Sequence, residues 1–349
     1  METADLVFKS IFVVGVFLVS LLIAMYSTYA ERKVAAFFQD RIGPNRAGPF
    51  GLLQPLADGV KMFMKEEIIP TKADKALFIL GPSIAMLTAC MTSVVIPWGD
   101  SLIINGREFV MQITDVNIGI LYIFGVVSIG VYGIMIGGWA SNNKFSLLGA
   151  LRASAQMISY ELAMGMSIIA LVMITGTLSV RDIVEGQPGL HWNVFVQPLG
   201  FLLFIICAFA ETNRTPFDLP ECETELVGGY HTEYSSMKLG FYLFAEYINM
   251  FIASAIIVSL YFGGYNFPFI NDLGLSHNMT TILGTLIFFL KIFFFIFFFM
   301  WVRWTIPRFR YDQLMRMGWQ ILIPLAVFNI VITAVFLLWK YDLWNTTLN

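Results

Sequence analysis

The sequence has 349 residues, of which 58% are hydrophobic and 13% are charged, and its formal net charge is −3. Soluble domains are typically about 45–50% apolar and about 25% charged, so the composition excludes a water-soluble globular protein. The small net charge gives no indication of a nucleic-acid partner.

Eight apolar runs are candidates for membrane-spanning helices. A helix needs about 20 residues to cross a hydrocarbon core of ~30 Å, and it satisfies its own backbone hydrogen bonds. The fifth run is the shortest and contains Pro198, so it could be tilted, broken or only partly spanning. We therefore predict an all-α integral membrane protein of about eight transmembrane helices in a single membrane domain, residues 1–349. The expected helices cover approximately 6–30, 76–98, 118–140, 156–178, 194–210, 239–262, 282–302 and 318–340.

The first polar loop contains a helix of a different kind, at about 51–66. Its apolar residues recur at helical spacing, while Asp58, Lys61 and Lys65 fall on the opposite face. This pattern predicts an amphipathic helix that lies in the membrane interface.

Lys and Arg are concentrated in the loops after the first, third, fifth and seventh helices, which hold sixteen of the 21 basic residues. Positively charged loops stay on the cytoplasmic side of a membrane. The odd-numbered loops are therefore expected to be cytoplasmic, with both termini on the periplasmic or outer side. The sixteen residues are Arg32, Lys33, Arg41, Arg46, Lys61, Lys65, Lys72, Lys75, Lys144, Arg152, Arg214, Lys238, Arg303, Arg308, Arg310 and Arg316.

The sequence has no pattern typical of a metal or nucleotide site. Its three cysteines form no CxxC pair, its three histidines lie far apart, and no phosphate-binding glycine loop is present. We therefore expect that this chain itself binds no FMN, iron–sulfur cluster or metal. The first apolar run is too long for a cleaved signal sequence, so the first helix is expected to stay.

Three ionisable residues fall inside expected helices: Glu161, Glu246 and Lys291. Each costs roughly 2.5–3.5 kcal/mol at a helix centre on insertion scales unless it is paired or hydrated, so such residues often mark ion or proton paths. The two glutamates could instead be structural, bonded to neighbouring helices. Lys291 could be a member of a proton relay or a structural counter-ion, and the sequence favours neither.

The fifth loop is strongly acidic. Carboxylates that cluster in a desolvated site oppose one another's ionisation, so some of them should hold protons near neutral pH. Together with the glutamates of the helices they indicate a path for protons into the membrane, although simple solvation explains any single loop glutamate equally well. The loop residues are Glu211, Asp218, Glu221, Glu223, Glu225 and Glu233.

Basic and aromatic residues accompany one another in the first, fifth and seventh loops. Such arginines can anchor to lipid phosphate or bind a partner protein. They could also line an entrance for an amphipathic ligand whose polar head passes the membrane surface, and a lipid-soluble quinone fits that description. The residues concerned are Arg32, Arg41, Arg46, Arg303, Arg308 and Arg310, with Phe37, Phe38 and Phe217.

Two features of the helices predict packing rather than chemistry. Gly133 and Gly137 form a small-xxx-small pair, which allows helices to approach closely. The phenylalanine run at 293–299 is expected to face lipid.

Four polar stretches resemble one family throughout the chain. They are Glu31-Arg32-Lys33 with QDRIGPNRAGPFGLLQPLADGVKMFMKEE (39–67), ISYELAMG (158–165), AETNRTPFDLPECETELVGGYHTEYSSMKLG (210–240) and RWTIPRFRYDQLMRMGWQILIP (303–324). In this order they resemble the H subunit of bacterial NADH-quinone oxidoreductase (respiratory complex I), the family of mitochondrial NADH dehydrogenase subunit 1. Cys222 departs from the family pattern, which has a small residue there.

The resemblance implies a membrane component of a proton-translocating NADH:quinone oxidoreductase, not catalytic alone, that helps form the quinone chamber and couples quinone reduction to proton translocation. Its substrate would be ubiquinone or menaquinone. Its partners would be the hydrophilic-arm subunits that carry the quinone site and the terminal iron–sulfur cluster, the membrane-arm subunits and membrane lipids, in a bacterial inner membrane.

The resemblance also assigns residues by motif. Arg32, Arg41, Arg46, Asp58, Phe217 and Arg303 would belong to the quinone channel. Glu161, Glu211, Glu221, Glu223, Glu225 and Glu246 would belong to the proton path, with Lys291 as a further candidate. A component of a membrane-bound hydrogenase-type complex and an independent ion or proton transporter are the alternatives.

Overall fold

The structure is a computed structural model that describes residues 3–104, 106–218, 226–268 and 274–347. Helices dominate it, and the predicted all-α membrane class is confirmed. The helices are α1 (Thr3–Phe38), α2 (Gln54–Met64), α3 (Lys75–Met91), α4 (Gly119–Ala140), α5 (Lys144–Thr175), α6 (Val180–Glu185), α7 (Asn193–Val196), α8 (Pro198–Glu211), α10 (Ser236–Tyr261), α11 (His277–Thr305), α12 (Tyr311–Arg316) and α13 (Ile323–Thr347). Short turns of other helix types lie at Pro49–Gly51, Thr92–Val95, Gly229–His231 (η3) and Met317–Leu322.

Seven helices of the described residues are long and apolar enough to cross a membrane: α1, α3, α4, α5, α10, α11 and the continuous stretch Tyr311–Lys340. The fifth expected run corresponds to α7 and α8. Pro198 begins α8, where a proline lacks no hydrogen bond that the helix needs, and the break leaves α8 with 14 residues. That is less than the roughly 20 residues of a full span.

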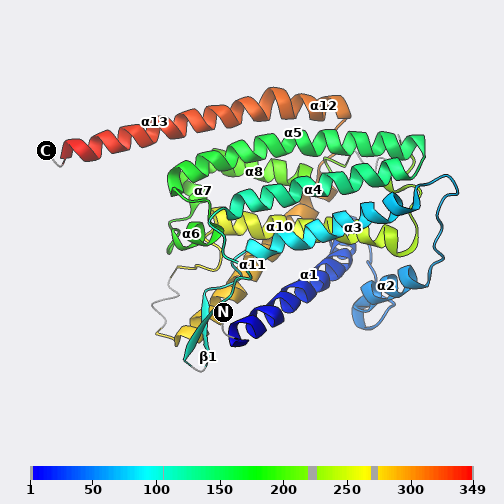
Figure 1. Ribbon diagram of the computed structural model, residues 1–349, viewed down its shortest axis with the longest axis horizontal. Helices are drawn as coiled ribbons and strands as arrows, with labels where there is room; N and C mark the ends of the chain where they lie inside the picture. The colour runs from blue at the N-terminus through cyan, green and yellow to red at the C-terminus, as the bar shows by residue number, and fades with distance from the viewer. Residues whose placement is uncertain (1–2, 105, 219–225, 269–273, 348–349) are drawn as a thin grey trace.

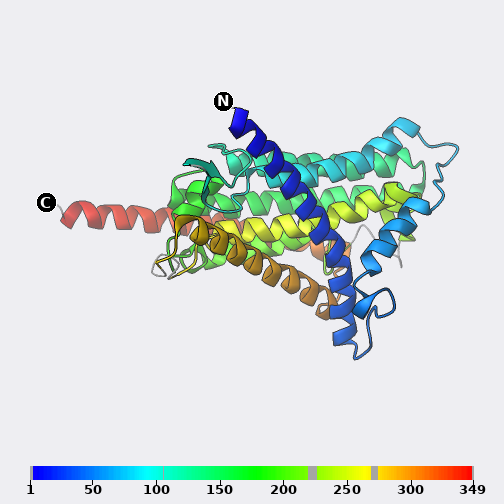
Figure 2. The same ribbon diagram turned by 90° about the horizontal axis from the view of Figure 1, so that it is seen from below.

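The helices form an elongated bundle (Figures 1 and 2). In this bundle α3, α4, α5, α8 and α10 run lengthwise, while α1 and α11 cross it obliquely. The stretch α12–α13 lies along α5, and the end of α13 extends beyond the bundle. The loops richest in Lys and Arg, with α2 and α12, gather at one end of the bundle, which we call the basic face.

Capping residues fix where the helices of the basic face begin. The Asp74 carboxylate accepts hydrogen bonds from the amides of Ala76 (3.0 Å) and Leu77 (3.3 Å), which satisfies free donors at the start of α3. Asn143 accepts a hydrogen bond from the amide of Phe145 (2.9 Å) at the start of α5. The turns that lead into α3 and α5 therefore have defined geometry.

The segment between α3 and α4 forms a hairpin, which was not predicted from the sequence. Its strands are β1 (Ser101–Ile104) and β2 (Arg107–Val110). The Asn278 side chain at the start of α11 bonds to both the amide and the carbonyl of Ile103, each at 2.8 Å. Because Asn278 occupies the outer edge of β1, the hairpin is held against the start of α11.

Helix α2 lies inside the range predicted for the interfacial helix. Leu56, Val60 and Phe63 are more than half exposed in this chain. Such an apolar surface on a helix outside the bundle suits a position against lipid or a partner, and the interfacial location stays a prediction.

Glycines allow α3 and α4 to pack backbone to backbone. A Cβ atom on Gly133 would lie 2.9 Å from the Ala85 amide nitrogen, and one on Gly81 would lie 2.9 Å from the Gly137 Cα. Both contacts are with backbone, which cannot move aside easily. Close approach of helices is a major source of association energy in lipid, so these glycines set the spacing of the bundle.

We expect Gly133→Ala to destabilise the protein by about 1–3 kcal/mol, because the added methyl group overpacks the α3–α4 contact. The matched control is Gly125→Ala in the same helix, since no atom lies within 4 Å of a Cβ placed there. The temperature of half-maximal aggregation in mild detergent measures the effect. Equal behaviour of the two variants would contradict the packing role of Gly133.

Candidate functional site

A buried carboxylate gathers two arginines and a tyrosine at the basic face. The Oε2 atom of Glu31 accepts hydrogen bonds from Arg214 Nη1 at 2.7 Å and from the Tyr247 hydroxyl at 2.8 Å. Its Oε1 atom forms an ion pair with Arg303 Nη1. These residues come from α1, the loop after α8, α10 and α11, so one carboxylate joins four segments. We call these four residues the Glu31 network.

The Glu31 network carries a net positive charge when its ionisable members are charged, because two guanidinium groups share one carboxylate. Arg214 is 4% exposed, and its guanidinium lies 4.1 Å from the centre of the Tyr247 ring. Burial by itself would lower the Arg214 pKa, but Glu31 outweighs it, and the pKa of Arg214 lies above its ordinary value. The buried arginine therefore stays charged at every physiological pH.

A cavity of about 330 Å³ lies directly outside the Glu31 network, between α1, α2, α10 and α11. Four residues of the predicted quinone channel line it: Arg32, Arg41, Asp58 and Arg303. Arg32 Nη1 and Asp58 Oδ2 form an ion pair at 2.7 Å, which fastens α2 to α1. Apolar side chains complete the wall, namely Met25, Ala35, Pro55, Met62, Leu243, Phe244 and Trp304. We call this space the basic cavity.

The structure does not bring the other two predicted channel residues to this cavity. Arg46 is exposed in the segment between α1 and α2. Phe217 is 4% exposed, and its ring lies 5.3 Å from the Tyr160 ring and 5.7 Å from the Phe309 ring. Phe217 thus packs in the core between α5 and the segment after α11.

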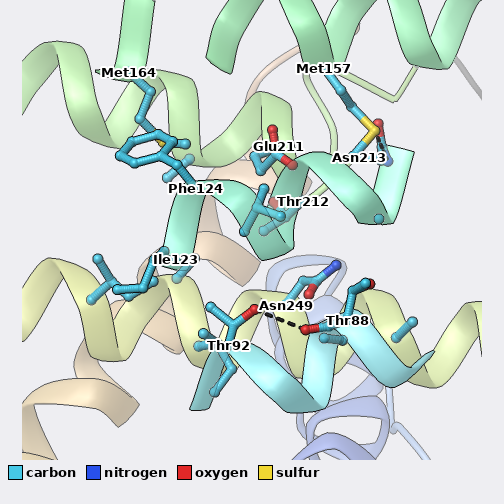
Figure 3. A pocket seen from close by; sticks show the side chains of 18 of the residues that line it. Thr88, Thr92, Ile123, Phe124, Met157, Met164, Glu211, Thr212, Asn213 and Asn249 are labelled. Carbon is cyan, nitrogen blue, oxygen red and sulfur yellow. Dashed lines mark hydrogen bonds between the residues drawn. The ribbon is translucent and has the colours of Figure 1, made fainter. Parts of the chain in front are cut away.

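A second cavity lies within the bundle and is lined by two of the predicted proton-path glutamates, Glu211 and Glu246 (Figure 3). The Tyr230 hydroxyl donates a hydrogen bond to Glu246 Oε1 at 3.0 Å. Within the part of the chain that the structure describes, the buried Oε2 atom of Glu211 has no hydrogen-bond partner. Thr88 and Asn249 add further polar groups to the wall. We call this space the inner cavity.

The inner cavity is large enough for water. Its volume is about 80 Å³, and one water needs roughly 10–15 Å³ of such volume, so about five waters fit. A buried polar group without a protein partner commonly bonds to ordered water. Glu211 and Glu246 therefore face a space in which water can bridge them.

Glu161 lies near this space on α5. Its Oε1 atom contacts the Ser128 hydroxyl of α4, and Glu161 is close enough to Glu211 for their charges to repel. Glu221, Glu223 and Glu225 fall outside the described residues.

Lys291 has a different environment. Its Nζ atom donates hydrogen bonds to the carbonyl oxygens of Phe262 (2.8 Å), Gly264 (2.9 Å) and Asn266 (2.7 Å). The Trp192 ring lies 5.2 Å from the same atom. An ammonium group has three donors, so these carbonyls use all of them. The arrangement fastens the end of α10 to α11.

Four residues of these sites, Glu31, Arg214, Tyr230 and Tyr247, were not predicted as site residues from the sequence. Glu31 precedes the predicted Arg32, and Tyr247 follows the predicted Glu246, so both were adjacent to a signal. Their partners come from distant segments, and sequence spacing does not show which segments meet. Among the described residues, no group of three or more His, Cys, Asp and Glu side chains is arranged to hold a metal ion.

Comparisons with known proteins point to one family. A family model described as NADH dehydrogenase matches residues 11–334. A relative from Cytophaga hutchinsonii, the first of its H subunits of NADH-quinone oxidoreductase, is 73% identical over 326 residues, which cover 93% of this chain and 95% of the relative. The H subunit of NADH-quinone oxidoreductase from Flavobacterium johnsoniae is 65% identical over 98% of both chains. The second H subunit from Geobacter metallireducens is 49% identical over 93% of both chains.

Glu31→Gln should destabilise the protein by about 3–5 kcal/mol, because it leaves a buried arginine without its counter-charge. The control is Glu185→Gln, which removes an exposed pair with Arg181 and should cost under about 1 kcal/mol. Thermal aggregation and the amount of protein in membranes report the difference. A Glu31→Gln protein as stable as the control would contradict the structural role of the Glu31 network.

Proposed function

Because the chain belongs to the H-subunit family of NADH-quinone oxidoreductase, we propose that its basic cavity forms part of the quinone chamber and that its buried glutamates carry protons. The chain is a multi-pass membrane component of this oxidoreductase, and other subunits of the complex are its partners. Quinone is the substrate of the complex.

The chemistry of the basic cavity supports the quinone part of the proposal. A lipid-soluble quinone has an apolar tail and a head with two carbonyl oxygens. The apolar wall between α1, α2 and α10 suits the tail, while Arg32, Arg41 and Arg303 offer donors to the head. Arg46 and Phe217 would act outside this cavity, at its approach or through the packing behind it. This coincidence of an apolar wall and three arginines is the observation that carries the proposal.

The inner cavity supports the proton part. Glu211 and Glu246 face it together, and Glu161 lies within electrostatic reach of Glu211. Carboxylates that repel one another exchange protons readily through water. Reduction of quinone changes charge at the basic cavity, and that local event would bias the protonation of these glutamates. Glu221, Glu223 and Glu225 would extend the path toward the basic face.

Lys291 fits the structural alternative better than the relay. Its three donors are all used by backbone carbonyls, and the contacts described for it include no carboxylate. A proton relay needs a group that can change partners.

The basic face would be cytoplasmic, with both termini on the periplasmic side of a bacterial inner membrane. The basic cavity opens at that face, where the hydrophilic arm with its FMN and iron–sulfur clusters would dock. Ubiquinone and menaquinone are both suitable quinones. The names of the relatives favour this function over a component of a hydrogenase-type complex or an independent transporter.

Purification from native membranes in mild detergent tests the proposed assembly. Flavin and iron–sulfur subunits should co-purify with this chain, together with inhibitor-sensitive NADH:quinone reduction. A lone chain recovered from intact, active membranes would contradict the assembly.

Arg41→Ala should raise the apparent KM for a short-chain quinone by about tenfold, since loss of one charge-assisted hydrogen bond is worth about 1.5 kcal/mol or more. Arg41 is exposed at the cavity wall, so assembly should be preserved. Steady-state kinetics with varied quinone give the measurement. Lys61→Ala, on the exposed outer side of α2, is the control and should leave the KM unchanged. An unchanged KM in Arg41→Ala would remove Arg41 from the chamber.

Glu246→Gln and Glu161→Gln should each lower proton translocation by about tenfold or more while the complex still assembles, because amides cannot carry protons and positioned proton carriers contribute about 10²–10⁴-fold. The readout is acidification of proteoliposomes during NADH oxidation. Glu66→Gln, exposed after α2, serves as the control. Loss of the assembled complex in both glutamate variants would instead favour a structural role.

A further inference from the structure

A hollow on the basic face lies apart from the basic cavity. It is lined by the segment after α2, by the turn between α4 and α5 and by Glu233, and no residue lines both spaces. Glu233 Oε1 accepts a hydrogen bond from Asn143 Nδ2 at 2.6 Å, which holds the carboxylate at the rim. Ser141, only 2% exposed, contributes to the floor. We call this space the surface hollow.

Hydroxyl groups continue inward from Ser141. The carbonyl oxygen of Gly137 accepts hydrogen bonds from Ser141 Oγ at 2.8 Å and from the Tyr234 hydroxyl at 3.2 Å. The Tyr242 hydroxyl lies at the same place, since an ideal Cβ on Gly137 would overlap it and would lie 3.0 Å from the Tyr234 hydroxyl. The missing side chain of Gly137 therefore leaves the space in which three hydroxyls meet.

Tyr242 leads from this point to the inner cavity. Its ring lies 5.1 Å from the Tyr234 ring and 5.0 Å from the Tyr230 ring. Tyr242 and Tyr230 both line the inner cavity, and the Tyr230 hydroxyl reaches Glu246 at 3.0 Å. Polar groups thus follow one another from the surface hollow to Glu246.

We propose that Ser141, Tyr234 and Tyr242 form a proton inlet from the surface hollow to the inner cavity, separate from the basic cavity. The inference rests on the proposed role of Glu246 in proton translocation. A hydroxyl both donates and accepts a hydrogen bond, so a row of hydroxyls with cavity water passes a proton by accepting one on one side and releasing another on the other. Glu233 at the rim supplies the proton, and Glu246 receives it.

The tyrosines act as neutral hydroxyls in this route. Burial raises the pKa of Tyr234 to about 12, so its phenol does not ionise near neutral pH. All three residues are almost fully buried, and they are accompanied by apolar neighbours such as Phe78, whose ring stacks on Tyr234 at 4.1 Å. The route is therefore narrow and admits protons without a wide water channel.

The test uses the whole complex in proteoliposomes with the variants Tyr242→Phe, Tyr234→Phe and Ser141→Ala. Each variant removes one hydroxyl and keeps the shape of the side chain almost unchanged. We expect proton translocation during NADH oxidation to fall by about tenfold, because loss of a positioned proton carrier costs about 10²–10⁴-fold when no water replaces it and less when one does. Coupled quinone reduction should fall with it.

Tyr261→Phe is the matched control. Tyr261 is another fully buried tyrosine of α10, and it is not among the residues that line the inner cavity. This variant should behave as the wild type. A stronger solvent deuterium isotope effect in the inlet variants than in wild type would separate proton transfer from a purely structural role, which would leave the isotope effect unchanged.

Unchanged translocation in all three inlet variants, or losses without a change in the isotope effect, would overturn the inlet. If Tyr242→Phe fails to assemble, Ser141→Ala decides the question, because it removes only a small hydroxyl. A wild-type complex that reduces quinone without translocating protons would overturn the proposed proton function itself. The two failures are therefore distinguishable.

Discussion

The Glu31 carboxylate is the contact on which the geometry of the basic face depends. Most of α1 lies on the outside of the bundle, with only 6% of its most apolar window buried. Lipid tails are as apolar as a helix surface, so apolar contact alone positions such a helix weakly. The hydrogen bonds and ion pairs from Arg214, Tyr247 and Arg303 hold its inner end against α10 and α11. The basic cavity lies between these helices, and its shape follows from this one anchor.

Helix α10 connects the two cavities. Tyr247 lines the basic cavity and Glu246 lines the inner cavity, because consecutive residues of a helix point about 100° apart. Arg214 is electrostatically coupled to Glu31 on one side and to Glu246 on the other. A change of charge in the basic cavity would therefore reach Glu246 through a short polar contact rather than through a large movement. This physical proximity supports coupling between quinone chemistry and proton transfer.

Sequence patterns anticipated the elements that depend on local composition. Hydropathy alone located the long helices, and the spacing of Leu56, Val60 and Phe63 located α2. The hairpin was not predicted although Asn105-Gly106 between apolar residues is a strong hairpin signal, because its strands are much shorter than the apolar runs beside them. Which polar side chains meet could not be predicted, since Glu31 and Arg214 are 183 residues apart and only the packing of α1 on α10 brings them together. The roles of Phe217 and Lys291 likewise depend on neighbours that spacing does not reveal.

Photoaffinity labelling of the intact complex tests the quinone chamber most directly. The probe is a photoreactive quinone analogue, and mass spectrometry of the cleaved chain identifies the labelled peptides. We predict labelling of the segments that line the basic cavity, at residues 25–62, 240–247 and 303–304, and loss of the label in the presence of excess quinone. Labelling confined to the phenylalanine run 293–299, unaffected by competing quinone, would contradict a quinone chamber at the basic cavity.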